Sequence, residues 1–271
     1  MVGRTATAAR LAAASTIPVP GGRVFVSERG SGTPIVFLHG GTGTGAHDWG
    51  GIVDALAPRY RTILFDLRGH GCSPDDDGTL GVVRFGLDAR HVLRALGVPR
   101  AVMVGFSVGG NTLLKLLSRD PRTAIALVTV GASARGDASR VAQIMAGPWP
   151  DYLMELEHAV GHGPDYWKDL RGALAGDWAH NLALSDGDVR RVTCPTLVCH
   201  GEGDRIQQLG YAHHLVETLP DAELFVAPDA GHAVQLDQPE LFVERLEAFL
   251  RPVLSSRTAR HQRAAARRSV P

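Results

Sequence analysis

The sequence predicts an α/β fold, in which a mostly parallel sheet is covered by helices on both faces. Short apolar runs of four to seven residues recur along the chain, each bounded by Gly, Pro or Asp. Strands that are buried on both faces have this composition. Amphipathic segments alternate with the runs, and such alternation is typical of parallel strands joined by helices.

The expected strands are spread over most of the 271 residues. Residues 23–27 (RVFVS) alternate apolar and polar side chains, as a half-buried antiparallel strand does. The continuous apolar runs that predict buried strands are Pro34–Leu38, Thr62–Phe65, Ala101–Val104, Ala124–Val130, Thr196–Cys199 and Leu224–Ala227. A chain of this length with 44% hydrophobic residues can bury one large core.

Helices are expected between these strands. Val82–Leu96 places its apolar residues near one face and ends at Gly97, shortly before Pro99, which is a typical helix stop. The other segments with a helical pattern are Val108–Leu117, Gln208–Leu219 and Pro239–Leu250.

One long segment interrupts the alternation. Residues 134–192 contain no convincing buried strand and hold the aromatic residues Trp149, Tyr152, Tyr166, Trp167 and Trp178. We predict a helical cap, or lid, inserted between core segments 21–133 and 193–251, because long insertions in such folds usually serve function. We predict a flexible leader over 1–20 and a disordered, Arg-rich tail over 252–271.

Composition limits the expected partners and location. Lys plus Arg and Asp plus Glu each total 28, which gives no reason to expect a nucleic acid or a membrane as partner. No apolar run is long enough to cross a membrane, and the N-terminus lacks the apolar stretch of a secretory signal. Three cysteines do not form a disulfide framework. We therefore expect a cytoplasmic monomer or homodimer that acts on a small molecule.

A serine flanked by glycines follows the run Ala101–Val104. Gly105-Phe-Ser-Val-Gly109 matches G-x-S-x-G and opens a helical segment. A strand that turns sharply into a helix holds such a serine in a strained conformation, and the glycines leave the necessary space. The helix directs its N-terminal N–H groups toward the serine. The pattern predicts Ser107 as a nucleophile.

A serine hydroxyl needs a base and an orienting acid to react. Among the 12 histidines, His232 lies between the last predicted strand and the last predicted helix, at the same sheet edge as Ser107. Asp204 follows the run Thr196–Cys199 and completes the chain order Ser, Asp, His. We predict His232 as the base and Asp204 as the acid, with Glu202 as the competing carboxylate.

A glycine-rich turn, His39-Gly-Gly-Thr-Gly43, follows the run Pro34–Leu38. Such a turn can direct backbone N–H groups into a site, so we assign the oxyanion hole to the N–H groups of Gly41 and Val108. Thr42 is the alternative to Gly41. The chain contains no G-x-x-x-x-G-K-[ST] pattern, which argues against a phosphate loop.

These motifs together resemble the α/β-hydrolase superfamily over roughly residues 24–250. The motifs that carry the resemblance are His39-Gly40, DLRGHGCS over 66–73, Gly105–Gly110, Gly201–Asp204 and Gly231-His232. The resemblance implies an eight-stranded sheet, a helical cap and no cofactor. The sequence GFSVGG is similar to esterases, enol-lactonases and cofactor-free haloperoxidase-type members.

At two positions the sequence differs from particular branches of this superfamily, which makes those branches less favoured. Carbon–carbon bond hydrolases of aromatic degradation share HGG and S-x-G-G but usually have Trp directly after the histidine, where this chain has Ala233. Dehalogenases and epoxide hydrolases use Asp as nucleophile, where this chain has Ser107.

We expect a serine hydrolase that cleaves a carboxylic ester, lactone or similar acyl bond of a small apolar substrate through an acyl-enzyme. Phe106, Trp149 and Trp178 are predicted to line the substrate pocket, although the two tryptophans could merely pack the cap on the core. No metal is expected, because Cys194 and Cys199 lack metal-ligand spacing. The alternatives are a carbon–carbon bond hydrolase, a biosynthetic acyl transferase or cyclase, and a non-hydrolytic ligand receptor.

Overall fold

The computed structural model describes residues 14–41, 43–135 and 166–268, without the side chains of 167, 168 and 257–268. The strands are β1 (Ala14–Val19), β2 (Gly22–Arg29), β3 (Pro34–Leu38), β4 (Arg61–Phe65), β5 (Ala101–Phe106), β6 (Ala124–Val130), β7 (Thr196–Gly201) and β8 (Ala222–Ala227). The helices are α2 (Gly45–Leu56), α3 (Val82–Ala95), α4 (Val108–Arg119), α7 (Tyr166–Asn181), α8 (Asp186–Val189), α9 (Leu209–Thr218), α10 (Val234–Asp237) and α11 (Pro239–Arg268), with the 3-10 turn η1 (Pro121–Thr123).

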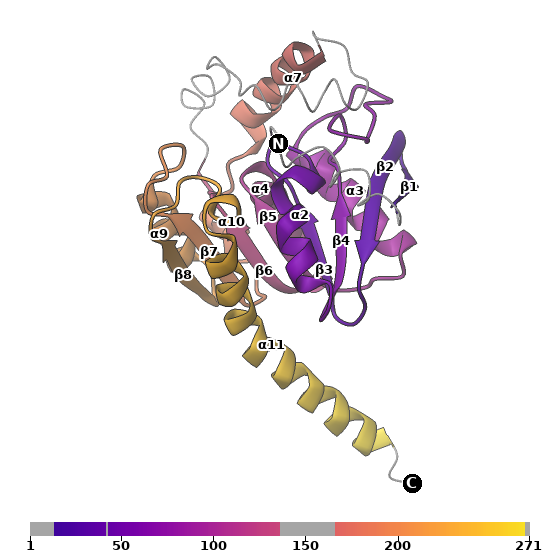
Figure 1. Ribbon diagram of the computed structural model, residues 1–271, viewed down its shortest axis with the longest axis vertical. Coiled ribbons are helices and arrows are strands. Elements are labelled where there is room, and N and C mark those ends of the chain that lie inside the picture. The colour runs from indigo at the N-terminus through magenta and orange to yellow at the C-terminus, as the bar shows by residue number, and fades with distance from the viewer. Residues whose placement is uncertain (1–13, 42, 136–165, 269–271) are drawn as a thin grey trace, which may run out of the picture.

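All eight strands form one sheet in the order β1-β2-β4-β3-β5-β6-β7-β8 (Figure 1). β1 and β2 run antiparallel to their neighbours, and β4, β3, β5, β6, β7 and β8 are parallel. The predicted α/β class, with a mostly parallel eight-stranded sheet, is confirmed. The parallel strands bring the loops after β3, β5, β6 and β7 to one edge of the sheet.

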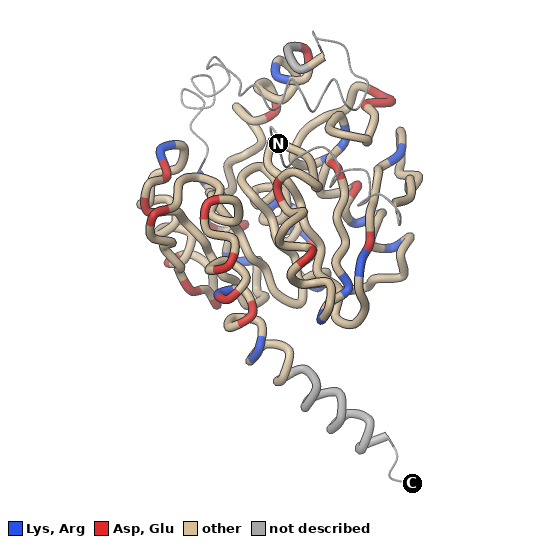
Figure 2. Tube along the Cα trace, in the orientation of Figure 1, with Lys and Arg blue, Asp and Glu red and all other residues tan. Residues whose placement is uncertain are grey.

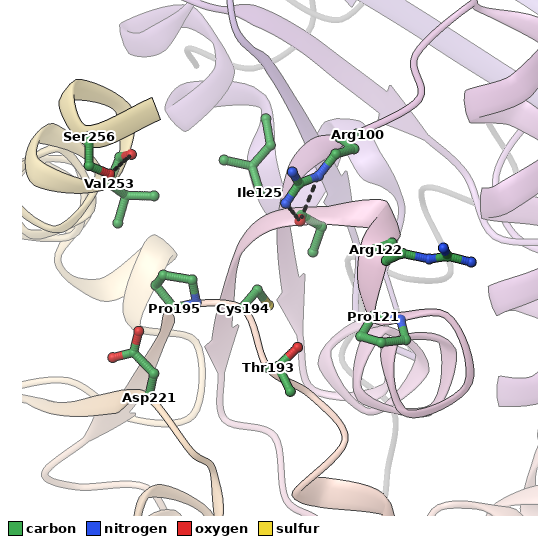
Figure 3. A pocket seen from close by; sticks show the side chains of 11 residues that line it. Arg100, Pro121, Arg122, Ile125, Thr193, Cys194, Pro195, Asp221, Val253 and Ser256 are labelled. Carbon is green, nitrogen blue, oxygen red and sulfur yellow. Dashed lines mark hydrogen bonds between the residues drawn. The ribbon is translucent and has the colours of Figure 1, made fainter. Parts of the chain in front are cut away.

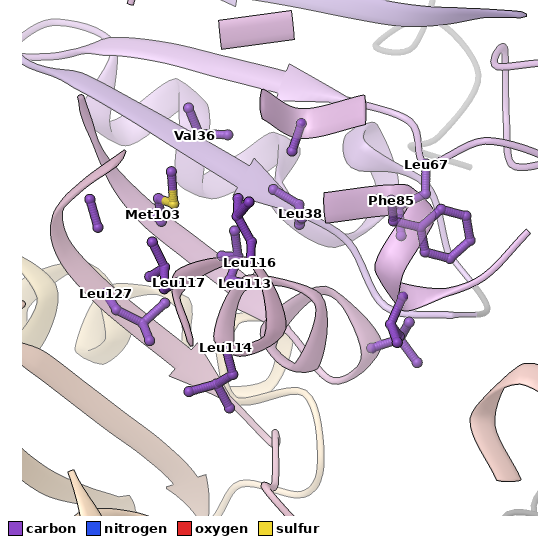
Figure 4. Packing of buried hydrophobic residues seen from close by; sticks show 14 of the residues in the cluster. Val36, Leu38, Leu67, Phe85, Met103, Leu113, Leu114, Leu116, Leu117 and Leu127 are labelled. Carbon is purple, nitrogen blue, oxygen red and sulfur yellow. The ribbon is translucent and has the colours of Figure 1, made fainter. Parts of the chain in front are cut away.

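Two apolar clusters pack on opposite faces of the sheet. On one face, Leu113 and Leu117 of α4 pack near Met103 of β5, and Phe85 of α3 lies beside Leu67 in the same cluster (Figure 4). On the other face, Trp49 of α2 contacts Phe37 and Phe242, with ring centroids 5.4 and 5.8 Å apart. The central strands are therefore buried on both sides, which explains their continuous apolar sequences.

Strand β1 corrects the prediction of a flexible leader over 1–20. Residues 14–19 pair with β2, from Ala14 opposite Ser27 to Val19 opposite Gly22. Ile17 and Val19 are buried, and Pro18 lies between them. Proline cannot donate to a ladder but is tolerated in an edge strand, and β1 is the edge of this sheet. Residues 14–19 therefore form an edge strand that contains a proline.

Helix α11 corrects the prediction of a disordered tail over 252–271. It continues through Pro252 and ends at Arg268, and its carboxyl-terminal half extends away from the body of the protein (Figure 1). Phe242, Leu246 and Phe249 anchor its first part on the sheet. Beyond Pro252 the sequence is rich in Ala and Arg, both of which favour helix.

The predicted cap segment 134–192 contains α7 and α8 among its described residues. Leu170, Leu174 and Trp178 of α7 are buried in the same cluster as α3 and α4. Helix α7 thus packs on the core, and Figure 1 shows it above the edge of the sheet where the parallel strands end. Residues 136–165 lie outside the described structure.

Charged residues of both signs are interspersed along the described chain (Figure 2). Among the helices that the structure describes, none is both long enough and apolar enough to cross a membrane.

A buried arginine joins three parts of the fold. Arg68, whose side chain is fully buried, donates to both carboxylate oxygens of Asp88 on α3, at 3.0 and 3.1 Å. Its remaining N–H groups reach the carbonyl oxygens of Pro20 and Gly21 in the β1–β2 turn. Arg68 therefore fixes the antiparallel edge of the sheet to α3 and to the loop after β4.

Replacement of this arginine should lower stability strongly. We expect Arg68→Met to lower the free energy of unfolding by about 3–5 kcal/mol, because it leaves the buried carboxylate of Asp88 without its bidentate partner. Urea unfolding followed by circular dichroism measures the change. Arg61→Met is the matched control, because its ion pair with Glu28 is about one-third exposed and should contribute less than about 1 kcal/mol. Equal losses in the two variants would contradict the assignment.

Candidate functional site

Ser107 lies at the sharp turn between β5 and α4, with φ 49° and ψ −116°. A Cβ at Gly105 would lie 2.6 Å from the carbonyl carbon of Gly109, and a Cβ at Gly109 would lie 2.5 Å from the carbonyl oxygen of Leu38. Only glycine fits at both positions. A positive φ is uncommon for serine and costs on the order of 1–3 kcal/mol. The predicted strained turn at Ser107 is present.

The neighbouring strand brings His232 beside Ser107. The N–H of Ser107 donates to the carbonyl oxygen of Val130, at the end of β6, at 2.7 Å. The next residue, Gly131, has φ +57° and lies against the imidazole, since a Cβ there would be 2.7 Å from Cε1 and 2.8 Å from Nδ1 of His232. Ser107 follows β5 and His232 follows β8, and both residues therefore contact the end of β6, which lies between these strands in the sheet.

Asp204 binds His232 directly. Its Oδ2 lies 2.8 Å from Nδ1 of the imidazole, and its Oδ1 accepts the N–H groups of Ile206 and Gln207. Burial raises the pKa of Asp204, but the hydrogen bonds and the His232 charge outweigh it and hold the pKa below its ordinary value. Glu202, the competing carboxylate, is exposed.

A second imidazole lies near this pair. His200, at the end of β7, is buried, and its Nδ1 is 4.0 Å from Oδ2 of Asp204. Burial lowers the pKa of His200 and outweighs the charge of Asp204, which raises it, while the charge of His232 lowers it further. A neutral His200 leaves the negative charge of Asp204 directed toward His232.

Buried polar side chains hold the glycine-rich turn after β3. The N–H of Gly40 donates to Oδ2 of Asp48 at 2.8 Å, so it is already used. His39 accepts the N–H of Leu67 at Nε2, at 2.8 Å, which leaves Nδ1 as the donor to the carbonyl oxygen of Gly40. Burial lowers the pKa of His39 well below its ordinary value, consistent with a neutral ring.

Gly41 and Val108, the two residues predicted to supply the oxyanion donors, are neighbours in the structure. A Cβ at Gly41 would be 3.1 Å from Cγ2 of Val108. Within the described part of the chain, neither N–H has a backbone acceptor, and Val108 is the first residue of α4, where N–H groups lack helical partners. Thr42, the alternative, lies outside the described residues.

Asp66 binds backbone N–H groups next to the same turn. Its oxygens accept the N–H groups of Gly45, the first residue of α2, and Cys72, at 2.8 and 2.9 Å. Complete burial raises its pKa from 3.8 to about 6, with a contribution from the charge of Asp48, against the two N–H groups. The DLRGHGCS segment thus contributes to the structure around the site.

Two of the three predicted pocket residues can be placed. The Phe106 ring lies between Gly40 and His232, with its centroid 5.1 Å from that of the imidazole. Trp178, on α7, covers Gly41, since a Cβ there would be 2.3 Å from Cζ2 and Cη2 of the indole. Trp149 lies outside the described residues.

Two polar contacts that the sequence did not suggest hold α7 in place. The hydroxyl of Tyr166 donates to the carbonyl oxygen of Gly69 at 2.7 Å. Asp177 accepts the N–H of Val82, at the start of α3, at 2.9 Å. These partners are about 95 residues apart in the chain, so no local pattern could reveal them.

A hollow of about 630 Å³ opens at the other edge of the sheet, where β6 and β7 begin (Figure 3). Arg100, Arg122 and Asp221 line it, and Arg100 donates to the carbonyl oxygen of Ala124 at 2.7 Å. This hollow is separate from the carboxyl edge that carries Ser107. In the described part of the chain, no three His, Cys, Asp or Glu side chains are grouped as metal ligands.

A methyl group at position 131 should displace the imidazole. Gly131→Ala is expected to remove the low-field ¹H NMR signal of the His232 Nδ1 proton bonded to Asp204, because the added Cβ collides with the ring. Gly97→Ala is the matched control, because Gly97 also has a positive φ, +66°, but has nothing within 4 Å of its Cβ position. Both variants should lose about 1–2 kcal/mol of stability from backbone strain. Retention of the signal in Gly131→Ala would contradict this placement of His232.

Asp66 should titrate about two pH units above an ordinary aspartate. Its folded pKa is about 6 against 3.8. The protonated form therefore stabilises the fold below about pH 4, and this contribution is lost as the pH rises through about 6. Carboxyl ¹³C shifts measured against pH should give a midpoint near 6 for Asp66 and below 3.8 for Asp204. A midpoint near 4 for Asp66 would contradict the burial argument.

Known proteins share this architecture and sequence. A pimeloyl-[acyl-carrier protein] methyl ester esterase of Chromobacterium violaceum is 30% identical over 257 residues, which covers 84% of this chain and 98% of that protein. A 2-hydroxy-6-oxo-2,4-heptadienoate hydrolase of Pseudomonas putida is 27% identical over 250 residues, which covers 82% of this chain and 90% of that protein. The solved structure of Est816, described as an N-acyl homoserine lactone degrading enzyme, has a TM-score of 0.74 and 26% identity and covers 87% of this chain and 100% of its own.

The model of the alpha/beta hydrolase family matches residues 35–245. This range runs from β3 into α11 and includes Ser107, Asp204 and His232. With the eight-stranded sheet and the sharp turn after β5, the match shows that the chain belongs to the α/β-hydrolase family.

Proposed function

We propose that this hydrolase cleaves a carboxylic ester, lactone or similar acyl bond of a small, largely apolar substrate through an acyl-enzyme on Ser107. The observation that carries the proposal is the hydrogen bond between His232 Nδ1 and Asp204 Oδ2. The imidazole of His232 packs against the end of β6, and the backbone N–H of Ser107 donates to the last residue of the same strand. Asp204 fixes the proton on Nδ1 and thereby leaves Nε2 free to act as a base.

In the first half-reaction, Ser107 Oγ attacks the substrate carbonyl carbon while His232 Nε2 takes the hydroxyl proton. The N–H groups of Gly41 and Val108 donate to the developing oxyanion, and each is worth on the order of 3 kcal/mol in the barrier. The tetrahedral intermediate then expels the alcohol, which receives the proton from His232.

In the second half-reaction, water attacks the acyl carbon and gives its proton to His232. The bond between Ser107 Oγ and the acyl carbon breaks, the proton returns to Ser107 and the carboxylic acid leaves. The negative charge of Asp204 stabilises the protonated imidazole in both halves. Every group in this cycle comes from the chain, the substrate or water.

The relatives support acyl chemistry but differ in substrate. The Chromobacterium relative acts on a methyl ester of an acyl-carrier protein by its name, and Est816 is described as degrading a lactone. The Pseudomonas putida relative acts on a dienoate with an oxo group, which is the specific reason to keep a carbon–carbon bond hydrolase as the second candidate. Ala233 in place of the usual Trp favours the ester. The free thiols Cys72, Cys194 and Cys199 favour a reducing, cytoplasmic location.

Removal of the nucleophile should abolish turnover. We expect Ser107→Ala to lower kcat on p-nitrophenyl butyrate by at least about 10³-fold and to prevent labelling by a fluorophosphonate probe. Ser118→Ala is the matched control, because Ser118 is a buried serine at the far end of α4 whose hydroxyl bonds Lys115. Both variants should keep the wild-type melting temperature to within a few degrees.

The same assay separates the alternatives. Full ester turnover by Ser107→Ala would refute the proposal. Turnover of 2-hydroxy-6-oxo-2,4-heptadienoate at a kcat/KM far above that of any ester or lactone would favour the carbon–carbon bond hydrolase. Probe labelling of Ser107 without turnover of any of these compounds would favour a ligand receptor.

A further inference from the structure

Trp178 carries a buried N–H group that has no acceptor. The side chain is 6% exposed, and its Nε1 has no hydrogen-bond partner among the described residues. The other buried tryptophan of the described chain behaves differently, since Trp49 Nε1 donates to the carbonyl oxygen of Leu38 at 3.0 Å. A buried donor without an acceptor costs about 1–3 kcal/mol, which a phenylalanine at this position would avoid.

The indole of Trp178 lies against Gly41, whose N–H is one of the two predicted oxyanion donors. Its Cζ2 and Cη2 are the atoms that a Cβ at Gly41 would meet at 2.3 Å, and Cγ2 of Val108 is 3.1 Å from the same point. In an indole, Cζ2 is bonded to Cε2, which is bonded to Nε1. The unpaired N–H is therefore two bonds from one of the ring atoms that contact Gly41.

Neighbouring acceptors are already engaged. The carbonyl oxygen of Gly41 is 3.2 Å from Nε2 of His70, and that of Gly40 contacts Nδ1 of His39 and the N–H of Gly43. The carboxylate of Asp177, the residue before Trp178, accepts from Val82 and Asn181.

The position of the indole is fixed by its helix. Tyr166 and Asp177 bond α7 to the core near both of its ends, and Leu170 and Leu174 bury the side between them. A rotation that brought the N–H to water would have to break this packing. The N–H thus stays buried on a ring that contacts Gly41.

We propose that Trp178 Nε1–H donates a hydrogen bond to an oxygen atom in the acyl part of the substrate. The preferred acyl group is then mostly hydrocarbon, with one ether, hydroxyl or oxo oxygen near the scissile carbonyl. The acyl side is assigned because Gly41, which the indole contacts, is one of the two residues proposed to hold the carbonyl oxygen of that group. This inference rests on the proposed function.

Two pairs of matched esters test the proposal. p-Nitrophenyl methoxyacetate and butyrate differ only by an oxygen in place of a methylene, and p-nitrophenyl 3-methoxypropionate and pentanoate place the exchange one atom further along. The readout is the ratio of kcat/KM for the oxygenated ester to that for its hydrocarbon partner. This ratio cancels intrinsic reactivity when wild type and variant are compared.

Trp178→Phe should lower the ratio about five-fold in at least one pair, since a neutral hydrogen bond is worth about 1 kcal/mol. Replacement of Trp178 by 3-benzothienylalanine keeps the ring shape, removes only the N–H and should give the same loss. Trp49→Phe is the matched control, because it removes a buried N–H that has an acceptor, and its ratio should equal that of wild type.

Wild-type ratios in both Trp178 variants, for both pairs, would overturn the assignment. Equal losses on oxygenated and hydrocarbon esters would also overturn it, because the N–H would then act on the oxyanion or on the fold. In both cases Ser107-dependent turnover persists and the proposed function stands. Absence of any Ser107-dependent ester turnover would refute both proposals.

Discussion

The turn at Ser107 exists because three backbone segments meet with no room for side chains. Gly105 approaches Gly109 within the turn, and Gly109 presses against the carbonyl oxygen of Leu38 at the end of β3. This contact fixes the first turn of α4 against the sheet, which sets where the N–H of Val108 points. It also holds Ser107 in its strained conformation, because relaxation of one segment would collide with another. The rest of the site is arranged around this fixed point.

Buried polar side chains accept hydrogen bonds from the backbone N–H groups of the glycine-rich turn. Backbone N–H groups that are shielded from water need acceptors, and a loop provides few of its own. Asp48 and Asp66 accept two of the N–H groups around this turn, and His39 ties it to the loop after β4. Among the described residues around this turn, Gly41 and Val108 keep N–H groups without a backbone acceptor. Asp66 accepts these hydrogen bonds from a buried position, and because burial disfavours the charged carboxylate, its pKa is raised.

Helix α7 of the cap packs on the core and also contacts the glycine-rich turn. Leu170, Leu174 and Trp178 are part of the cluster formed by α3 and α4, while the Trp178 ring also covers Gly41. Trp178 therefore packs the cap on the core, one of the two roles that the sequence presented as alternatives, and it also contacts Gly41. Because α7 is bonded to the core near both ends, the position of Trp178 against Gly41 is fixed.

The sequence by itself determined the strand segments along the chain and the mostly parallel sheet, and it predicted Ser107, Asp204 and His232 as the catalytic residues, because apolar periodicity and the steric needs of a tight turn are local. It misjudged both ends of the fold, since Pro18 lies in an edge strand and Pro252 lies within a helix. Only the tertiary structure decided between Asp204 and Glu202, through the bond to His232, and assigned Asp48, Asp177 and Arg68 their partners. Those contacts depend on how distant strand ends and helices pack together, and side chains that meet only after folding leave no periodic pattern in the chain.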